Sequence, residues 1–200
     1  MYASAFVLGF HGCDESVGEK ILAGKEHLKT SVNEYDWLGE GIYLWENSPR
    51  RALDWAEFVH ANPKFFKTKI TKPFVLGAIV DLGLCLDLTE AGSLMVVREA
   101  HDALIDFLKA LKYPIPKNQQ SGSKDEDLVK RHLDCAVINY VHAINETAEL
   151  PQYDTVRGMF SEGTPLYPNG RIMAKTHVQI AVRHSRLIRG YFRPILPIEK

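Results

Sequence analysis

The sequence has few cysteines, no long apolar run and almost no net charge. Its 200 residues include only three cysteines, an odd number without metal-ligand spacing, which argues against a disulfide framework and favours a reducing cytoplasm. No apolar segment approaches the roughly 20 residues that cross a bilayer, so we expect no membrane partner. With 46% hydrophobic residues and a formal charge of −1, residues 1–200 are predicted to form a single globular domain.

Several familiar motifs are also missing. The apolar run near the N-terminus has no basic leader and no A-x-A-like cleavage site, which makes it a poor signal peptide. The chain has no Walker loop. It also lacks a Gly-x-Gly-x-x-Gly after the first predicted strand, which disfavours NAD as a redox cofactor in a Rossmann fold. We expect no metal cofactor.

The first informative segment lies near the N-terminus. Ala5 to Phe10 form an apolar run of strand length, followed by His11 and Gly12. A histidine and a glycine at the end of a strand place an imidazole beside accessible backbone N–H and C=O groups. A single histidine is more often an ordinary surface or core residue, so this segment alone carries little weight.

The second segment is a glycine turn that leads into an aromatic strand. Gly39 and Gly41 precede Ile42 to Trp45, which has strand composition. Asn47 or Ser48 can then cap a helix that has Pro49 in its first turn. A buried strand and helix with no ligand would show the same pattern.

Together the two segments resemble motifs of the ADP-ribosyltransferase superfamily, in its diphtheria-toxin and poly(ADP-ribose) polymerase branch. The branch has a His-Tyr-Glu triad on three strands. Its strand-His-Gly motif matches residues 9–12, and its Gly-x-Gly-hydrophobic-Tyr-hydrophobic motif matches residues 39–44. The resemblance implies an α+β fold with a split β-sandwich core and flanking helices. Local patterns add two expectations: the apolar run at residues 73–81 predicts a strand, and apolar residues at helical spacing from Leu94 to Leu111 and from Leu128 to Ile144 predict a helical hairpin inserted at residues 89–148.

The third triad position departs from the family pattern. The late strand that should hold the glutamate is predicted at residues 176–182, where Gln179 takes the matching position. We expect it to pair with the β-rich run at 187–192, since only a short polar connection separates the two. A glutamine there argues against polymer synthesis but is compatible with transfer of a single ADP-ribose. Glu162, in the preceding loop, is the candidate for a second acidic group, and an exposed loop glutamate is its equally plausible alternative.

The resemblance also implies roles for particular residues. NAD is expected as a co-substrate, with His11 on a ribose hydroxyl, Gly12 on the carboxamide and Tyr43 against the nicotinamide ring. Trp55 and Ser31 are further candidates for NAD contacts, although a core tryptophan and an ordinary loop serine would explain them equally well.

The resulting hypothesis is a mono-ADP-ribosyltransferase that releases nicotinamide and modifies a macromolecule, either protein or nucleic acid. The resemblance suggests a bacterial toxin or defence effector, with an antitoxin or other inhibitory partner. A basic C-terminal segment slightly favours a nucleic-acid acceptor or a pyrophosphate. One alternative is an inactive module that binds NAD or ADP-ribose, and another is an interaction protein built around the helical hairpin.

Overall fold

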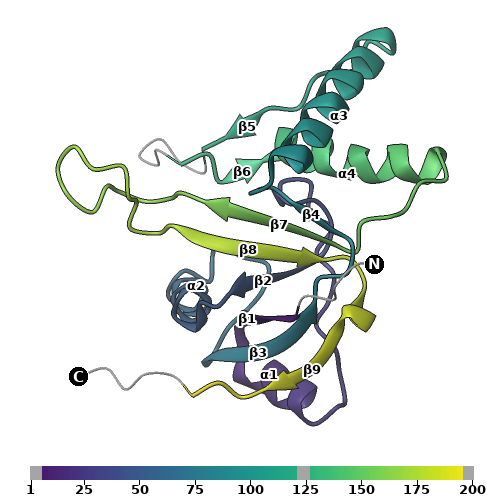
Figure 1. Cartoon of the computed structure of the whole chain (residues 1–200). Coiled ribbons are helices and arrows are strands. Elements are labelled where there is room, and N and C mark those ends of the chain that lie inside the picture. Colours follow the sequence, from purple (N-terminus) through teal and green to yellow (C-terminus); the bar gives the residue numbers. More distant parts are fainter. Residues whose placement is uncertain (1–5, 121–126, 196–200) are drawn as a thin grey trace.

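A seven-stranded mixed sheet organises the molecule (Figure 1). The computed structural model describes residues 6–120 and 127–195, so Ala5 and part of the polar stretch at 117–126 lie outside it. The strand order is β4-β7-β8-β2-β1-β3-β9. The bounds of these strands are β1 Phe6–Asp14, β2 Ile42–Glu46, β3 Pro73–Asp81, β4 Cys85–Asp87, β7 Thr155–Phe160, β8 His177–Val182 and β9 Ile188–Phe192.

In the part of the chain that the structure describes, four α-helices lie against the sheet or beside it: α1 Glu15–Leu22, α2 Pro49–Ala61, α3 Ala91–Ala110 and α4 His132–Thr147. A two-stranded ribbon, β5 Asn118–Gln119 with β6 Lys130–Arg131, connects α3 to α4. Helices α3 and α4 pack against each other, and we call residues 89–148 the helical insertion. The described residues therefore confirm an α+β fold.

Local sequence explains where several elements begin and end. Asp14 caps α1, because its Oδ1 accepts the backbone N–H of Ser16 at 3.0 Å. Gly24, with a φ of +70°, lies just beyond the helix end, where the left-handed conformation is least costly for glycine. Pro49 occupies the first turn of α2, where its missing N–H costs nothing.

Two predictions about strands need correction. The first strand continues to Asp14, so His11 and Gly12 lie inside β1 and pair with β3. The pairing of β8 with β9 is also wrong. Strand β8 lies between β7 and β2, whereas β9 forms the opposite edge beside β3. A short connection indicated neighbouring strands, but here η1 Ser185–Leu187 carries the chain to the far edge.

Each face of the sheet has its own core. We call the face that α1 covers the back face and the face that α2 and α4 cover the front face. On the back face, Ile21 of α1 joins a cluster that includes Leu44, Leu76 and Ile180. On the front face, α2 packs over β1 through Ala52, and α4 packs over β2 and β8 through Ile138. Side chains between these two helices on the front face form the candidate site.

Candidate functional site

The site begins where β1 and β2 separate. The register between them contains two residue pairs, Gly9 with Glu46 and Phe10 with Trp45, whereas β1 and β3 pair over nine residues. Residues 11–14 then continue beside β3 alone. The two strands thus form a fork that is closed at Phe10 and open beyond it.

His11 lies in the fork and bridges its two sides. Its Nδ1 is 2.9 Å from the backbone carbonyl oxygen of Tyr43. Because a carbonyl can only accept, Nδ1 carries the proton, and in the neutral ring Nε2 is then a free lone pair. Burial lowers the pKa of His11, although the hydrogen bond to Tyr43 opposes that effect. The ring lies 6.5 Å from that of Trp55, measured between centroids.

The phenol of Tyr43 closes the preceding turn. Its hydroxyl donates to the Gly39 carbonyl at 2.8 Å and accepts the Leu38 backbone N–H at 2.9 Å. Burial raises the pKa of Tyr43, so the phenol stays protonated. Gly39 has a φ of +75°, as expected for a glycine turn. The hydroxyl is therefore committed to the protein, which leaves the ring for any contact with a ligand.

Gln179 is buried, with 9% of its surface exposed. Its Oε1 accepts the indole N–H of Trp37 at 2.7 Å. The Trp37 ring packs against Phe160, and the guanidinium of Arg131 lies 4.3 Å from the centroid of the indole. The motifs matched at residues 9–12 and 39–44 do not include Trp37, so it was not among the predicted site residues.

Strand register places two of the predicted side chains, Tyr43 and Gln179, on one face of the sheet, whereas it pairs His11 with Leu76 of the back-face core. Tyr43 pairs with Ala181, and Trp45 pairs with Gln179. Because alternate residues of a strand share a face, Tyr43, Trp45 and Gln179 all point to the front of the sheet. The ring of Trp45 lies 6.1 Å from that of Trp55, which in turn neighbours His11. We call Trp37, Tyr43, Trp45, Trp55 and Gln179, together with the neighbouring His11, the front layer.

Charged residues border the front layer at the start of β8. His177 holds its Nδ1 2.6 Å from the carbonyl oxygen of Lys175, and burial lowers the pKa of His177. Glu162 is half-buried, and burial raises the pKa of its carboxyl group. Arg131 and Arg51 oppose that rise, which places both arginines near Glu162. Glu162 and His177 therefore lie near the same two arginines, Arg51 and Arg131.

Three buried polar atoms of this region have no hydrogen-bond partner. They are the indole nitrogen of Trp45, Nε of Arg51 and Nε2 of His177. Among the described residues, the only other such atoms are the two ring nitrogens of His142. Buried donors and acceptors are almost always satisfied in folded proteins, by protein or by solvent. These three atoms therefore have hydrogen-bonding capacity that no protein group uses.

Two predicted contacts have structural explanations of their own. A Cβ on Gly12 would come within 2.1 Å of the Ala52 carbonyl oxygen, so this glycine is required for α2 to pack on β1. Ser31 forms a backbone bridge with Gly41, and its hydroxyl accepts from the Asn33 side chain at 2.8 Å. Ser31 therefore lies beside the start of β2, where its backbone and its hydroxyl both have partners within the protein.

Comparisons of this chain with protein-family models, curated proteins and solved structures found no match. The site must therefore be judged on its own geometry.

Two further observations concern metals and membranes. Within residues 6–120 and 127–195, no three histidine, cysteine, aspartate or glutamate side chains are grouped to hold a metal ion. In the same ranges, no helix is both long and apolar enough to cross a membrane.

Proposed function

We propose that the protein is an NAD-dependent mono-ADP-ribosyltransferase whose front layer binds the nicotinamide half of NAD. The unsatisfied polar atoms beside Gln179 carry this proposal, because a dinucleotide has hydroxyl, amide and phosphate groups to satisfy them. The fork between β1 and β2 supports it as well, since it resembles the split core expected of such enzymes.

The chemistry suits a site that orients its substrate more than it reacts. The bond between C1′ of the ribose and the nicotinamide nitrogen breaks through an oxocarbenium-like state, as in glycoside hydrolysis. Nicotinamide leaves as a neutral molecule with the electron pair of that bond, so no general acid is required. In this proposal Nε2 of His11 accepts a hydrogen bond from a ribose hydroxyl, while the rings of Tyr43 and Trp55 pack against the nicotinamide.

In this proposal Gln179 and Glu162 take two roles that a single glutamate has in the family pattern: Gln179 binds the ribose, and Glu162 acts as the base. Because Trp37 fixes the amide oxygen of Gln179, its NH₂ group is available to a ribose hydroxyl. The amide supplies no negative charge to the developing cation, which costs a few kcal/mol relative to a preorganised carboxylate. Glu162 accepts a proton from the nucleophilic group of the acceptor as that group bonds to C1′.

The acceptor in this proposal is a macromolecule, protein or nucleic acid. The wider setting, a bacterial toxin or defence effector with an inhibitory partner, depends on the motif resemblance alone, and the cytoplasmic location depends on the cysteine content.

Release of labelled nicotinamide from NAD tests the activity. We expect turnover by the intact chain and a loss of at least about a hundredfold in His11→Ala, since orientation and polar contacts each contribute factors of that order. His60→Ala, which removes an exposed histidine of α2 outside the proposed contacts, is the matched control. Equal turnover in the two variants would exclude the proposed role of His11.

An inactive binding module is the second candidate. The hydrogen bond between Trp37 and Gln179 favours this candidate, because the indole N–H occupies the side-chain oxygen at the third triad position. This candidate predicts saturable NAD binding and heat-stabilisation without nicotinamide release. An interaction protein would show neither NAD binding nor heat-stabilisation.

A further inference from the structure

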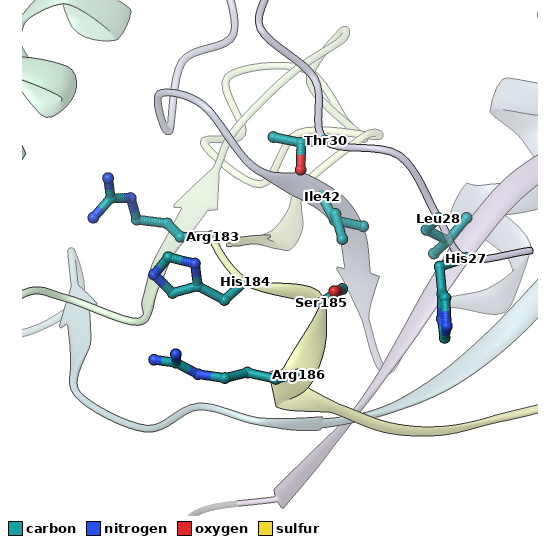
Figure 2. Close-up of a pocket in the computed structure, with 8 residues that line it drawn as sticks. All are labelled: His27, Leu28, Thr30, Ile42, Arg183, His184, Ser185 and Arg186. Carbon is teal, nitrogen blue, oxygen red and sulfur yellow. The ribbon is translucent and has the colours of Figure 1, made fainter.

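A cavity lies beside the start of β2 and the turn that follows β8. It has a volume of about 410 Å³, within the range of small-ligand sites. Figure 2 shows Arg183, His184 and Arg186 extending to the same side of the turn after β8, with His27 across from them. The remaining lining residues are Leu28, Thr30, Ile42 and Ser185.

The lining combines positive charge with hydroxyl groups. It contains two guanidinium groups, two imidazoles, and the hydroxyls of Thr30 and Ser185, and none of its eight residues is acidic. Leu28 and Ile42 are almost fully buried, so the accessible part of the lining is polar. Such a surface suits an anion with several oxygen acceptors.

The two arginines keep donors available for a ligand. Nη1 of Arg183 donates to the Tyr153 carbonyl at 3.3 Å, one of the five N–H donors that a guanidinium carries. Arg186 is 72% exposed and lies 3.5 Å from Asp154, a long contact in open solvent. Acidic neighbours are nonetheless present: Glu40, Glu146 and Asp154 raise the pKa of Arg183 against the effect of burial. Charge alone therefore does not select the ligand, and the hydroxyls must contribute.

The cavity also accounts for part of the basic C-terminal segment. Arg189 pairs with Asp81 at 2.8 Å, and Arg193 pairs with Glu19, so those two arginines have structural partners. Arg183 follows the end of β8, four residues beyond Gln179 and about 13 Å away at the usual strand rise. Ile42 of the lining belongs to the back-face core, whereas the adjacent Tyr43 packs with the front-face core. A ligand here would be separate from one in the front layer.

We infer that this cavity binds the phosphate group of a nucleotide-type ligand, through Arg183, Arg186 and the hydroxyls of Thr30 and Ser185. The inference does not depend on ADP-ribose transfer. The same phosphate chemistry is present in a free nucleotide and at the end of a nucleic-acid strand.

Calorimetry of the full chain at low ionic strength tests the inference, with AMP as probe and adenosine as its phosphate-free control. We expect AMP to bind at least about tenfold more tightly than adenosine, and to weaken as salt is added. Arg186→Gln should weaken AMP binding about threefold or more. Thr30→Val, which changes no charge, should weaken it by a similar factor. Arg171→Gln, an exposed arginine outside the lining, should leave it unchanged.

Equal binding of AMP and adenosine, no AMP binding at millimolar concentration, or equal effects of Arg186→Gln and Arg171→Gln would overturn the inference. A short oligonucleotide with and without a 5′-phosphate separates the two sources: tighter binding of the phosphorylated strand than of AMP assigns the site to nucleic acid. NAD binding that His11→Ala abolishes and Arg186→Gln leaves intact belongs to the front layer. Failure of the phosphate site would therefore leave the proposed enzyme activity standing.

Discussion

At the scale of single residues, the contact between Trp37 and Gln179 is central to the front layer. The indole N–H holds an amide oxygen that is buried and has strand neighbours on both sides. An amide can be turned over with little change in shape, so this one donor decides which end of Gln179 a ligand meets.

Trp37→Phe tests that contact. It leaves the Gln179 oxygen buried without its donor, and we expect the free energy of unfolding to fall by about 1–3 kcal/mol in urea titrations. Tyr35→Phe, in the same loop at an exposed position, is the control and should change little. The loss should be larger in a Gln179→Glu background, because hydrogen bonds to charged groups are stronger. Equal losses in both backgrounds would show that the indole contributes only packing.

His142 is a second residue with a measurable signature. It is 5% exposed, and neither ring nitrogen has a partner. Burial, reinforced by Arg183, lowers its pKa from 6.5 to about 4. Between these values the unfolded chain binds a proton that the folded chain does not, so the free energy of unfolding falls as the pH drops from 6.5 towards 4.

His142→Leu should therefore make the protein less sensitive to acid. We expect the advantage of the variant over the parent to grow by about 2–3 kcal/mol between pH 7 and pH 4.5, measured by denaturant titration at each pH. Part of the acid sensitivity should remain, because burial also lowers the pKa of His11 and His177. An advantage that does not change with pH would mean that His142 is protonated in the folded protein.

At the scale of elements, the packing of α2 on β1 depends on a missing side chain. The Ala52 carbonyl of α2 occupies the space where a Cβ of Gly12 would be. A helix backbone cannot move aside as a flexible side chain can, so this contact sets how closely α2 approaches the fork.

Gly12→Ala should be strongly destabilising, by about 3 kcal/mol or more, because α2 must shift as a unit. Gly92→Ala is the matched control: nothing lies within 4 Å of its added Cβ on α3, and we expect a gain of up to about 1 kcal/mol. Thermal unfolding of both variants provides the comparison. A stable Gly12→Ala protein would contradict the packing described above.

Sequence predicted single elements better than their partners. The apolar run at residues 73–81 became β3 with those bounds, and the helical spacing from Leu94 to Leu111 corresponds to α3. Local patterns contain such information because a strand or helix repeats over a few residues. They contain none about which strand lies beside β9, and that pairing was wrong.

The same limit applies to the candidate site. His11, Tyr43 and Gln179 were chosen from motifs, and the sheet register turns Tyr43 and Gln179 to one face. Trp37, Trp45 and Arg51 could not be found in that way. Their importance comes from a hydrogen bond across 142 positions of sequence and from buried nitrogens without partners, which only the folded chain reveals.

At the scale of the whole molecule, an ion network ties three strands of one half of the sheet together. Arg157 on β7 donates to Glu46 of β2 at 2.5 and 3.1 Å and to Asp87 of β4 at 3.0 Å. All three side chains are mostly buried, with 21%, 11% and 26% exposed. Loss of the arginine would leave two carboxylates without their counter-charge in this setting.

Arg157→Met should lower the free energy of unfolding by about 2–4 kcal/mol, somewhat less than for a fully buried network because solvent screens part of the charge. Lys20→Met is the control. Lys20 lies 3.2 Å from Glu26 with both side chains well exposed, and its loss should cost under about 1 kcal/mol. Urea titrations of the two variants measure the difference, and similar values would show that the network adds no more than a surface pair.

The indole donor of Trp37 has a consequence for the history of the site. An N–H group serves a glutamate oxygen as readily as a glutamine oxygen, and the two side chains have nearly the same shape. Glutamine codons become glutamate codons by changing one base. A single base change would thus place a carboxylate at position 179, where the indole N–H of Trp37 could donate to it without any rearrangement. The geometry of the site therefore does not require an uncharged side chain at this position.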